Sequence, residues 1–119
     1  MKTVEDLEKK INSELNTKIN NSKIKHNQIY LNIDEKDLLD VVLFLKTNDQ
    51  TKFRQLIEIT AVDFPEKEKR FKMVYLLLSH EKNHRVLVDM YVKEKEIVST
   101  LTSIFPSANW MEREVFDMY

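Results

Sequence analysis

The chain has 119 residues, of which 42% are hydrophobic and 33% are charged, and its formal net charge is −1. This length fits one domain, which we place at residues 1–119, and the nearly balanced charge argues against a surface that binds nucleic acid or anionic lipid. The sequence contains no glycine and no cysteine. This excludes glycine-rich phosphate-binding loops, disulfides, thiolate catalysis and iron–sulfur ligation by these residues.

The first part of the chain predicts a helix, a hairpin and a second helix. Thr3 can cap a helix whose apolar residues recur at helical spacing, namely Val4, Leu7, Ile11 and Leu15. Alternating apolar residues then indicate a short hairpin that turns near His26 and Asn27. Asp34 is the expected N-cap of a helix over residues 35–46, which has a wide apolar face made of Leu38, Val41, Val42 and Leu45.

The rest of the chain predicts three strands followed by two helices. The strands span residues 55–63, 71–79 and 85–92, and charged turns separate them. A helix is expected from about residue 94 to Pro106, with an apolar stripe of Ile97, Leu101 and Ile104. The predicted fold is therefore α+β, a two-layer domain with helices packed on a mixed sheet of about five strands, in the order α-β-β-α-β-β-β-α-α.

The strand at residues 71–79 is predicted to lie inside the sheet. Its run of three leucines, residues 76–78, indicates apolar cover on both faces. Because alternate positions of neighbouring strands share a face, we expect one core that contains Ile57, Ile59, Val74, Leu76, Val86, Val88 and Leu101.

Residues 80–84, HEKNH, spell the H-E-x-x-H pattern of zinc proteases. That chemistry requires a helix, on which two histidines at i and i+4 share one face and bind zinc while the glutamate activates water. Here the flanking residues are strand-like, the centre is typical of a turn, and no histidine follows downstream. We therefore expect His80 and His84 to be solvated or hydrogen-bonded at a hairpin end, with adventitious metal binding more plausible than a catalytic zinc site.

The last stretch of the chain, NWMEREVFDMY over residues 109–119, is the densest cluster of charged and apolar residues. As a helix, it forms an apolar stripe of Met111, Val115 and Met118. Arg113, Glu114 and Asp117 gather on the other side. They form either a solvated face with an Arg113–Asp117 ion pair worth about 0.3 kcal/mol, or a docking surface.

Four blocks of the sequence, in the right order, resemble the family of the thirty-kilodalton subunit, the C subunit, of respiratory complex I, the proton-pumping NADH:quinone oxidoreductase. The first three blocks are EITAVDFPEKEKRFKMVYLLLS at residues 58–79, NHRVLVDMYV at 83–92 and IFPSANW at 104–110. The fourth is the signature Glu112-Arg113-Glu114, two spacers, Asp117 and two large apolar residues. The resemblance covers about the second half of the chain. Family members continue with a glycine and a long proline-containing tail, so we expect this chain to lack that tail.

The resemblance implies a non-redox structural and docking subunit of the peripheral arm. Its implied partners are the complex I subunits D and B, of which D forms the quinone site and B is its neighbour. It implies no cofactor in this chain, with NADH, FMN, iron–sulfur clusters and quinone in the assembled complex. Arg113 is the expected anchor, because its planar fork can bind a carboxylate in bidentate fashion. The full set of expected interface residues is Trp110, Glu112, Arg113, Glu114 and Asp117, with Glu58, Asp63 and Arg70 as lesser candidates.

The implied location is peripheral, on the cytoplasmic face of the bacterial inner membrane or the matrix side in mitochondria. No run approaches the roughly 18 apolar residues of a membrane span, so membrane contact is expected only through the complex. Two alternatives stay open. One is the equivalent subunit of a related membrane-bound hydrogenase or formate-oxidising complex, which neighbouring genes would identify. The other is an unrelated α+β protein-binding domain, which would not copurify with respiratory subunits.

Overall fold

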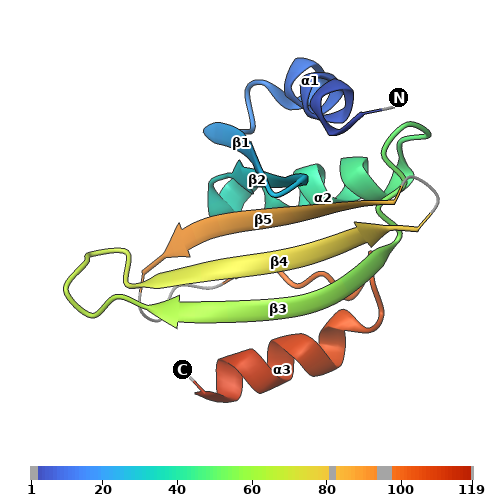
Figure 1. The fold of residues 1–119 in the computed structure, drawn as a ribbon. Coiled ribbons are helices and arrows are strands. Elements are labelled where there is room, and N and C mark those ends of the chain that lie inside the picture. The colour runs from blue at the N-terminus through green and yellow to red at the C-terminus, as the bar shows by residue number, and fades with distance from the viewer. Residues whose placement is uncertain (1–2, 81–82, 94–97, 119) are drawn as a thin grey trace.

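The computed structural model describes the chain except residues 1–2, 81–82, 94–97 and 119, and describes only the backbone of residues 116–118. Its elements are α1 (Val4–Leu15), β1 (Asn21–Lys25), β2 (Gln28–Asn32), the 3-10 turn η1 (Glu35–Asp37), α2 (Leu38–Thr47), β3 (Gln55–Asp63), β4 (Phe71–Ser79), β5 (His84–Val92) and α3 (Ala108–Met118). The strands form one mixed sheet in the order β1-β2-β5-β4-β3, in which only β2 and β5 pair in parallel. Figure 1 shows α2 behind this sheet and α3 beside its edge strand β3. The predicted α+β fold class is confirmed.

Helix α1 begins as the sequence predicts. The backbone N–H of Asp6 donates a 3.1 Å hydrogen bond to the Thr3 hydroxyl, which satisfies one of the free donors of the first turn. The four apolar residues at helical spacing are all buried: Val4, Leu7, Ile11 and Leu15. They pack toward β1 and β2, so the helix contributes one end of the core.

The β1–β2 hairpin turns at the two predicted residues without a glycine. His26 and Asn27 have φ values of 53° and 62°, the left-handed pair that a two-residue type I′ turn requires. Asparagine and histidine tolerate this region better than most residues that carry a Cβ. Ile29 and Leu31, which share one face of β2, are fully buried.

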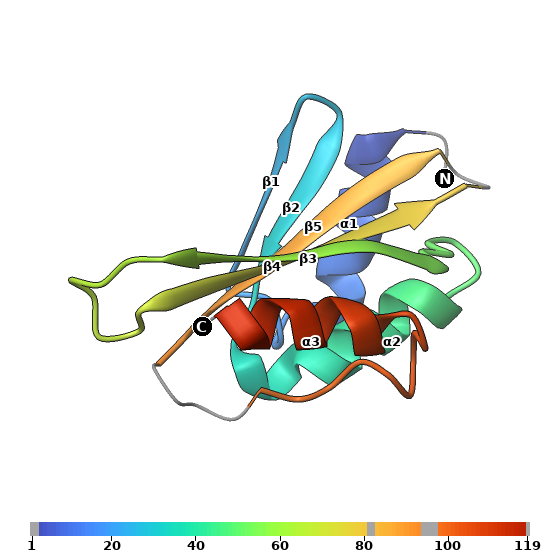
Figure 2. The same ribbon diagram turned by 90° about the horizontal axis from the view of Figure 1, so that it is seen from below.

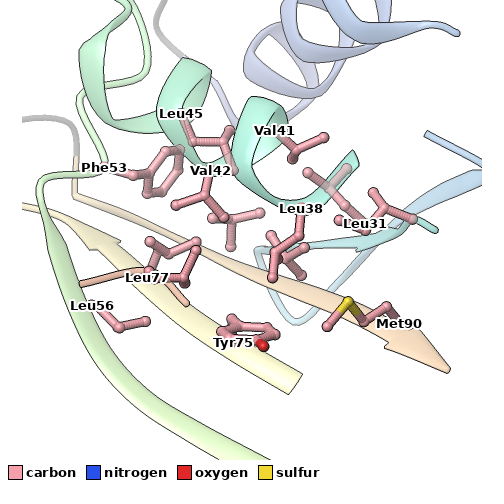
Figure 3. Close-up of a cluster of buried hydrophobic side chains, with 14 of the residues drawn as sticks. Leu31, Leu38, Val41, Val42, Leu45, Phe53, Leu56, Tyr75, Leu77 and Met90 are labelled. Atoms are coloured by element: carbon pink, nitrogen blue, oxygen red, sulfur yellow. The ribbon is translucent and has the colours of Figure 1, made fainter. Parts of the chain in front are cut away.

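Helix α2 covers the centre of the sheet. Its predicted face, Leu38, Val41, Val42 and Leu45, is buried. Asp34 occupies the predicted N-cap position, at the start of η1, which leads into α2, but its side chain makes no capping hydrogen bond to the first turn. Its carboxylate instead accepts a 3.0 Å hydrogen bond from the side-chain amide of Asn20. Figure 3 shows side chains from α2, the sheet and Phe53 meeting in one cluster.

The three long strands appear at the predicted positions, but two of them present a different face to the core. A bulge between Leu56 and Glu58 shifts the register of β3, which buries Leu56 and Ile59 and leaves Ile57 38% exposed. On β4 the buried residues are Met73, Tyr75, Leu77 and Ser79.

The predicted core residues Val74 and Leu76 therefore lie half-buried on the opposite face of the sheet. Shifting the inward-facing positions of a strand by one residue turns every side chain to the opposite face. Because β4 carries apolar residues on both faces, the sequence pattern did not decide which face meets the core. The other four predicted core residues are buried: Ile59, Val86, Val88 and Leu101. Strand β4 is internal to the sheet, as predicted, between β5 and β3. Its outer face carries no helix within the described residues, as Figures 1 and 2 show.

The helix expected after β5 is absent from residues 98–107, which form turns, while residues 94–97 lie outside the described part of the chain. Two carboxylates hold this segment. Glu35 accepts hydrogen bonds from the backbone N–H and hydroxyl of Ser99, and Glu112 accepts one from the backbone N–H of Leu101. The Thr100 hydroxyl oxygen also accepts a local hydrogen bond, from the backbone N–H of Thr102. These side-chain bonds replace helical ones.

Candidate docking surface on the C-terminal helix

Helix α3 lies along the edge strand β3 and turns one side toward the core. Ala108 and Val115 are buried, and Met111 is half-buried against the core cluster. The predicted apolar stripe is therefore confirmed for Met111 and Val115, while the side chain of Met118 lies outside the described residues. The stripe leaves the other side of the helix for polar and aromatic residues.

Trp110 and Arg113 lie on the exposed side of α3. The Trp110 side chain is 70% exposed, and the guanidinium carbon of Arg113 lies 5.4 Å from the centroid of the indole ring. This is a cation–π contact, which holds the arginine near the ring while leaving its N–H groups able to bind a carboxylate. Because exposed tryptophan beside arginine is typical of interface hot spots, this pair marks a candidate docking surface.

Glu112 points the other way. It is only 6% exposed, and its two carboxylate oxygens accept hydrogen bonds from the Thr100 hydroxyl at 2.5 Å and the Leu101 backbone N–H at 2.8 Å. A buried carboxylate needs such donors. Its observed contacts are thus internal, and they tie α3 to the 98–107 segment rather than to the exposed surface.

Tertiary structure brings Glu114 and Glu58 to one groove. Both are exposed, and both line a groove of about 320 Å³ between α3 and β3. They lie far apart in the sequence, so no local pattern could have paired them. Asp117 belongs to the same helix, but its side chain lies outside the described residues.

Asp63 and Arg70 pair with each other at the base of the β3–β4 hairpin. The Arg70 guanidinium donates from Nε to one oxygen of Asp63 at 2.6 Å and from Nη2 to the other at 2.8 Å. This bidentate bond, with the arginine's charge, holds the pKa of Asp63 below its ordinary value, against the opposing effect of burial. The pair closes the hairpin and is half-buried, so its visible role is structural.

The two histidines of the H-E-x-x-H pattern lie at the ends of β4 and β5, on strand-flanking positions as predicted, while residues 81–82 lie outside the described part of the chain. His80 follows β4 and contacts the Gln55 side chain at 2.5 Å, whereas His84 opens β5. The Nδ1 atom of His84 is buried and has no hydrogen-bond partner among the described residues, and burial lowers the pKa of this histidine. Among the residues that the structure describes, no three His, Cys, Asp or Glu side chains gather as a metal would require.

The buried hydroxyl of Tyr75 was not predicted from the sequence. Tyr75 is fully buried under α2, and its hydroxyl has no hydrogen-bond partner within the part of the chain that the structure describes. Burial, together with the nearby carboxylates of Glu112 and Glu35, raises the pKa of Tyr75. A tyrosine inside an apolar strand was the available signal, but only the fold shows which side of β4 it occupies. Figure 3 shows it among aliphatic side chains.

Comparison with known proteins places this geometry in a family. The profile described as "Respiratory-chain NADH dehydrogenase, 30 Kd subunit" matches residues 31–119. The C subunit of NADH-quinone oxidoreductase from Dinoroseobacter shibae is 45% identical over 98 residues, covering 82% of this chain and 46% of the relative. The corresponding C subunit of a Chelativorans species is 33% identical over 114 residues, covering 96% of this chain and 57% of the relative. The chain thus spans about half the length of the curated relatives it matches.

A solved structure shares the fold. A chain from the membrane-bound sulfane sulfur reductase, an archaeal respiratory membrane complex, superposes with a TM-score of 0.84 at 24% identity, covering 97% of this chain and 66% of that chain. Among the described residues, no helix has the length and apolar character needed to cross a membrane. Because the family profile extends over well more than half of its residues, this chain belongs to the family of the 30 kDa subunit of the respiratory-chain NADH dehydrogenase.

Proposed function

We propose that this chain acts as a non-redox structural and docking subunit in the peripheral arm of an NADH:quinone oxidoreductase. It packs against subunits D and B, the quinone-site protein and its neighbour, at the cytoplasmic or matrix side of the membrane. There it supports electron transfer from NADH to quinone, coupled to proton translocation, by holding the quinone module together. Family membership and the names of the relatives support this assignment.

The residue types in the chain support a role without redox chemistry. Its 119 residues include no cysteine to hold an iron–sulfur cluster and no glycine for a dinucleotide-binding turn. FMN, NADH, the iron–sulfur clusters and quinone are then bound by other subunits. The contribution of this chain is the stability and orientation of its neighbours.

The observation that carries the docking role is the exposed Trp110 with Arg113 stacked on it. Leaving a tryptophan 70% exposed forgoes much of the favourable burial of a large aromatic side chain. A partner that covers the ring recovers that free energy, and an acidic residue of the partner can pair with Arg113 in a site that excludes water. Glu114, an exposed residue of the same helix, can accept a hydrogen bond from a partner donor.

The test is co-purification of the tagged chain with subunits D and B from cells that express the complex. Trp110→Ala and Arg113→Ala are each expected to lower recovery of D and B by about tenfold or more, because a covered aromatic or charge pair is lost. Arg85→Ala, which removes an exposed arginine from the start of β5, is the matched control and should leave recovery unchanged. NADH:quinone activity of the membranes should follow recovery.

One result for Arg113→Ala would contradict the docking assignment. If Arg113→Ala unfolds the isolated chain, while its remaining folded fraction still recovers D and B normally, the α3 surface has an internal structural role. The docking assignment would then be wrong.

A further inference from the structure

The groove between α3 and β3 has a shape suited to an extended chain. Five consecutive residues of β3, 57–61, line one wall, and Met111, Glu114 and Val115 of α3 line the other. Four residue steps along a strand cover about 13 Å. The groove therefore follows the direction of the strand, and its volume of about 320 Å³ suits a few side chains rather than a whole helix.

The floor and the rim of this groove differ in chemistry. Ile59, Met111 and Val115 supply apolar surface, and Ile57 adds an apolar lip that the β3 bulge leaves 38% exposed. Among the described residues that line the groove, the charged ones are Glu58 and Glu114, one on each wall. With the residues that the structure describes, neither carboxylate makes a hydrogen bond or an ion pair.

Two unpaired acids facing one apolar groove indicate a basic and apolar occupant. A single carboxylate on a surface is solvated and needs no partner. Glu58 and Glu114 line the same groove, and an arginine or lysine that enters it can form charge-assisted hydrogen bonds to these carboxylates. An apolar side chain beside that cation would bury the exposed lip at Ile57.

We propose that this groove binds an extended segment of a partner subunit that inserts a large apolar side chain and places an adjacent arginine or lysine against Glu58 and Glu114. The inference rests on the proposed docking function, since it names a second contact of the same helix. The Trp110–Arg113 pair takes an acidic partner group, and the groove takes a basic one. Opposite charges on two parts of one helix would fix the orientation of the partner.

A site-specific cross-link tests the groove directly. Because the chain contains no cysteine, Thr60→Cys on the groove wall and Asn109→Cys beside Trp110 each create a single attachment point for a benzophenone maleimide. After irradiation of the co-expressed complex, the label at residue 60 is expected to join a peptide that has arginine or lysine next to a large apolar residue. The label at residue 109 should join D or B at a different peptide.

Charge reversal supplies the second test. The double variant Glu58→Lys/Glu114→Lys is expected to lower recovery of the cross-linked partner by about tenfold or more, and reversing the partner's basic residue to glutamate should restore it. The control Asp49→Lys/Glu66→Lys changes the net charge equally at two exposed positions and should not lower recovery. Melting temperatures of the isolated variants verify that the chain still folds.

The outcomes separate the groove from the docking function. Cross-links from residue 109 to D or B, with none from residue 60 and normal recovery of the double lysine variant, would overturn the groove proposal and leave the docking function standing. Absence of D and B from every preparation would overturn the docking function itself. A cross-link from residue 60 to an acidic segment would also refute the proposed occupant.

Discussion

Helices α2 and α3 both pack against the sheet, yet they distribute their side chains in opposite ways. Helix α2 buries only apolar residues, and its buried positions coincide with its sequence pattern. Helix α3 buries a carboxylate, Glu112, and exposes a tryptophan, Trp110. In a monomer this arrangement forgoes stability, because burying an acid requires dedicated donors and exposing an indole ring loses hydrophobic free energy. Helix α2 exposes two leucines, Leu39 and Leu43, but less fully than α3 exposes Trp110. The buried acid and the more exposed ring support the proposal that α3 also serves a contact beyond the fold.

The largest expected effect comes from the core side of the sheet. Leu77→Ala on β4 should lower the free energy of unfolding by about 2–5 kcal/mol, since Leu77 is fully buried beneath α2. Its neighbour Leu76 lies half-buried on the outer face, so Leu76→Ala should cost only about 1 kcal/mol. Urea unfolding of the isolated chain measures both. Equal losses of unfolding free energy in Leu77→Ala and Leu76→Ala would mean that the outer face of β4 is as well packed as the core.

A second pair of variants compares two glutamates of α3. Glu112→Ala leaves the buried N–H of Leu101 without its acceptor and should lower the free energy of unfolding by about 1–3 kcal/mol. Glu114→Ala removes an exposed carboxylate and should change it by no more than about 0.5 kcal/mol. Hydrogen exchange at the Leu101 amide gives an independent readout. If that amide stays protected in Glu112→Ala, the carboxylate is not what holds the 98–107 segment.

A smaller effect is expected from the Asp63–Arg70 pair, and it depends on pH. The pKa of Asp63 is lowered in the folded chain from its ordinary value of 3.8 by the Arg70 hydrogen bond. The pair therefore stabilises the fold above that value, and its contribution is lost as pH falls below 3.8 through the lower folded pKa. Carbon-detected NMR titration of the Asp63 carboxyl should show the lowered pKa, and Arg70→Gln should return it toward 3.8. An unchanged titration in Arg70→Gln would refute this cause.

The smallest expected effect on stability belongs to the exposed pair of α3. Arg113→Ala removes an exposed cation–π contact and should lower the free energy of unfolding by less than about 1 kcal/mol. Arg113→Ala is expected to lower recovery of D and B far more than it lowers stability, whereas Leu77→Ala is expected to act mainly on stability. Thermal unfolding of the isolated chain, measured beside co-purification, provides the comparison. If Arg113→Ala lowers thermal stability and co-purification to similar extents, the distinction between a structural α2 and a docking α3 does not hold.

Local patterns in the sequence determined most of the elements and the family. Periodic apolar residues predicted α1, α2 and the three long strands, because helical and strand spacing follow from backbone geometry alone. The His26–Asn27 turn was also predictable, since histidine and asparagine tolerate positive φ and alternating apolar residues follow the turn. The charged signature that begins at Glu112 indicated the family before any contact was known.

Tertiary structure decided what each face and each charged residue does. The bulge in β3 and the phase of β4 depend on neighbouring strands, so Ile57 and Leu76 were assigned to the core when they lie outside it. In residues 98–107, which form turns, backbone N–H groups donate to two carboxylates outside the segment, that of Glu35, far away in the sequence, and that of Glu112 on the following helix. The same long-range contacts turn Glu112 inward while Glu114 stays exposed and meets Glu58 across a groove. Spacing along one element predicts which side chains share a face, but which face becomes buried is set by what packs against it.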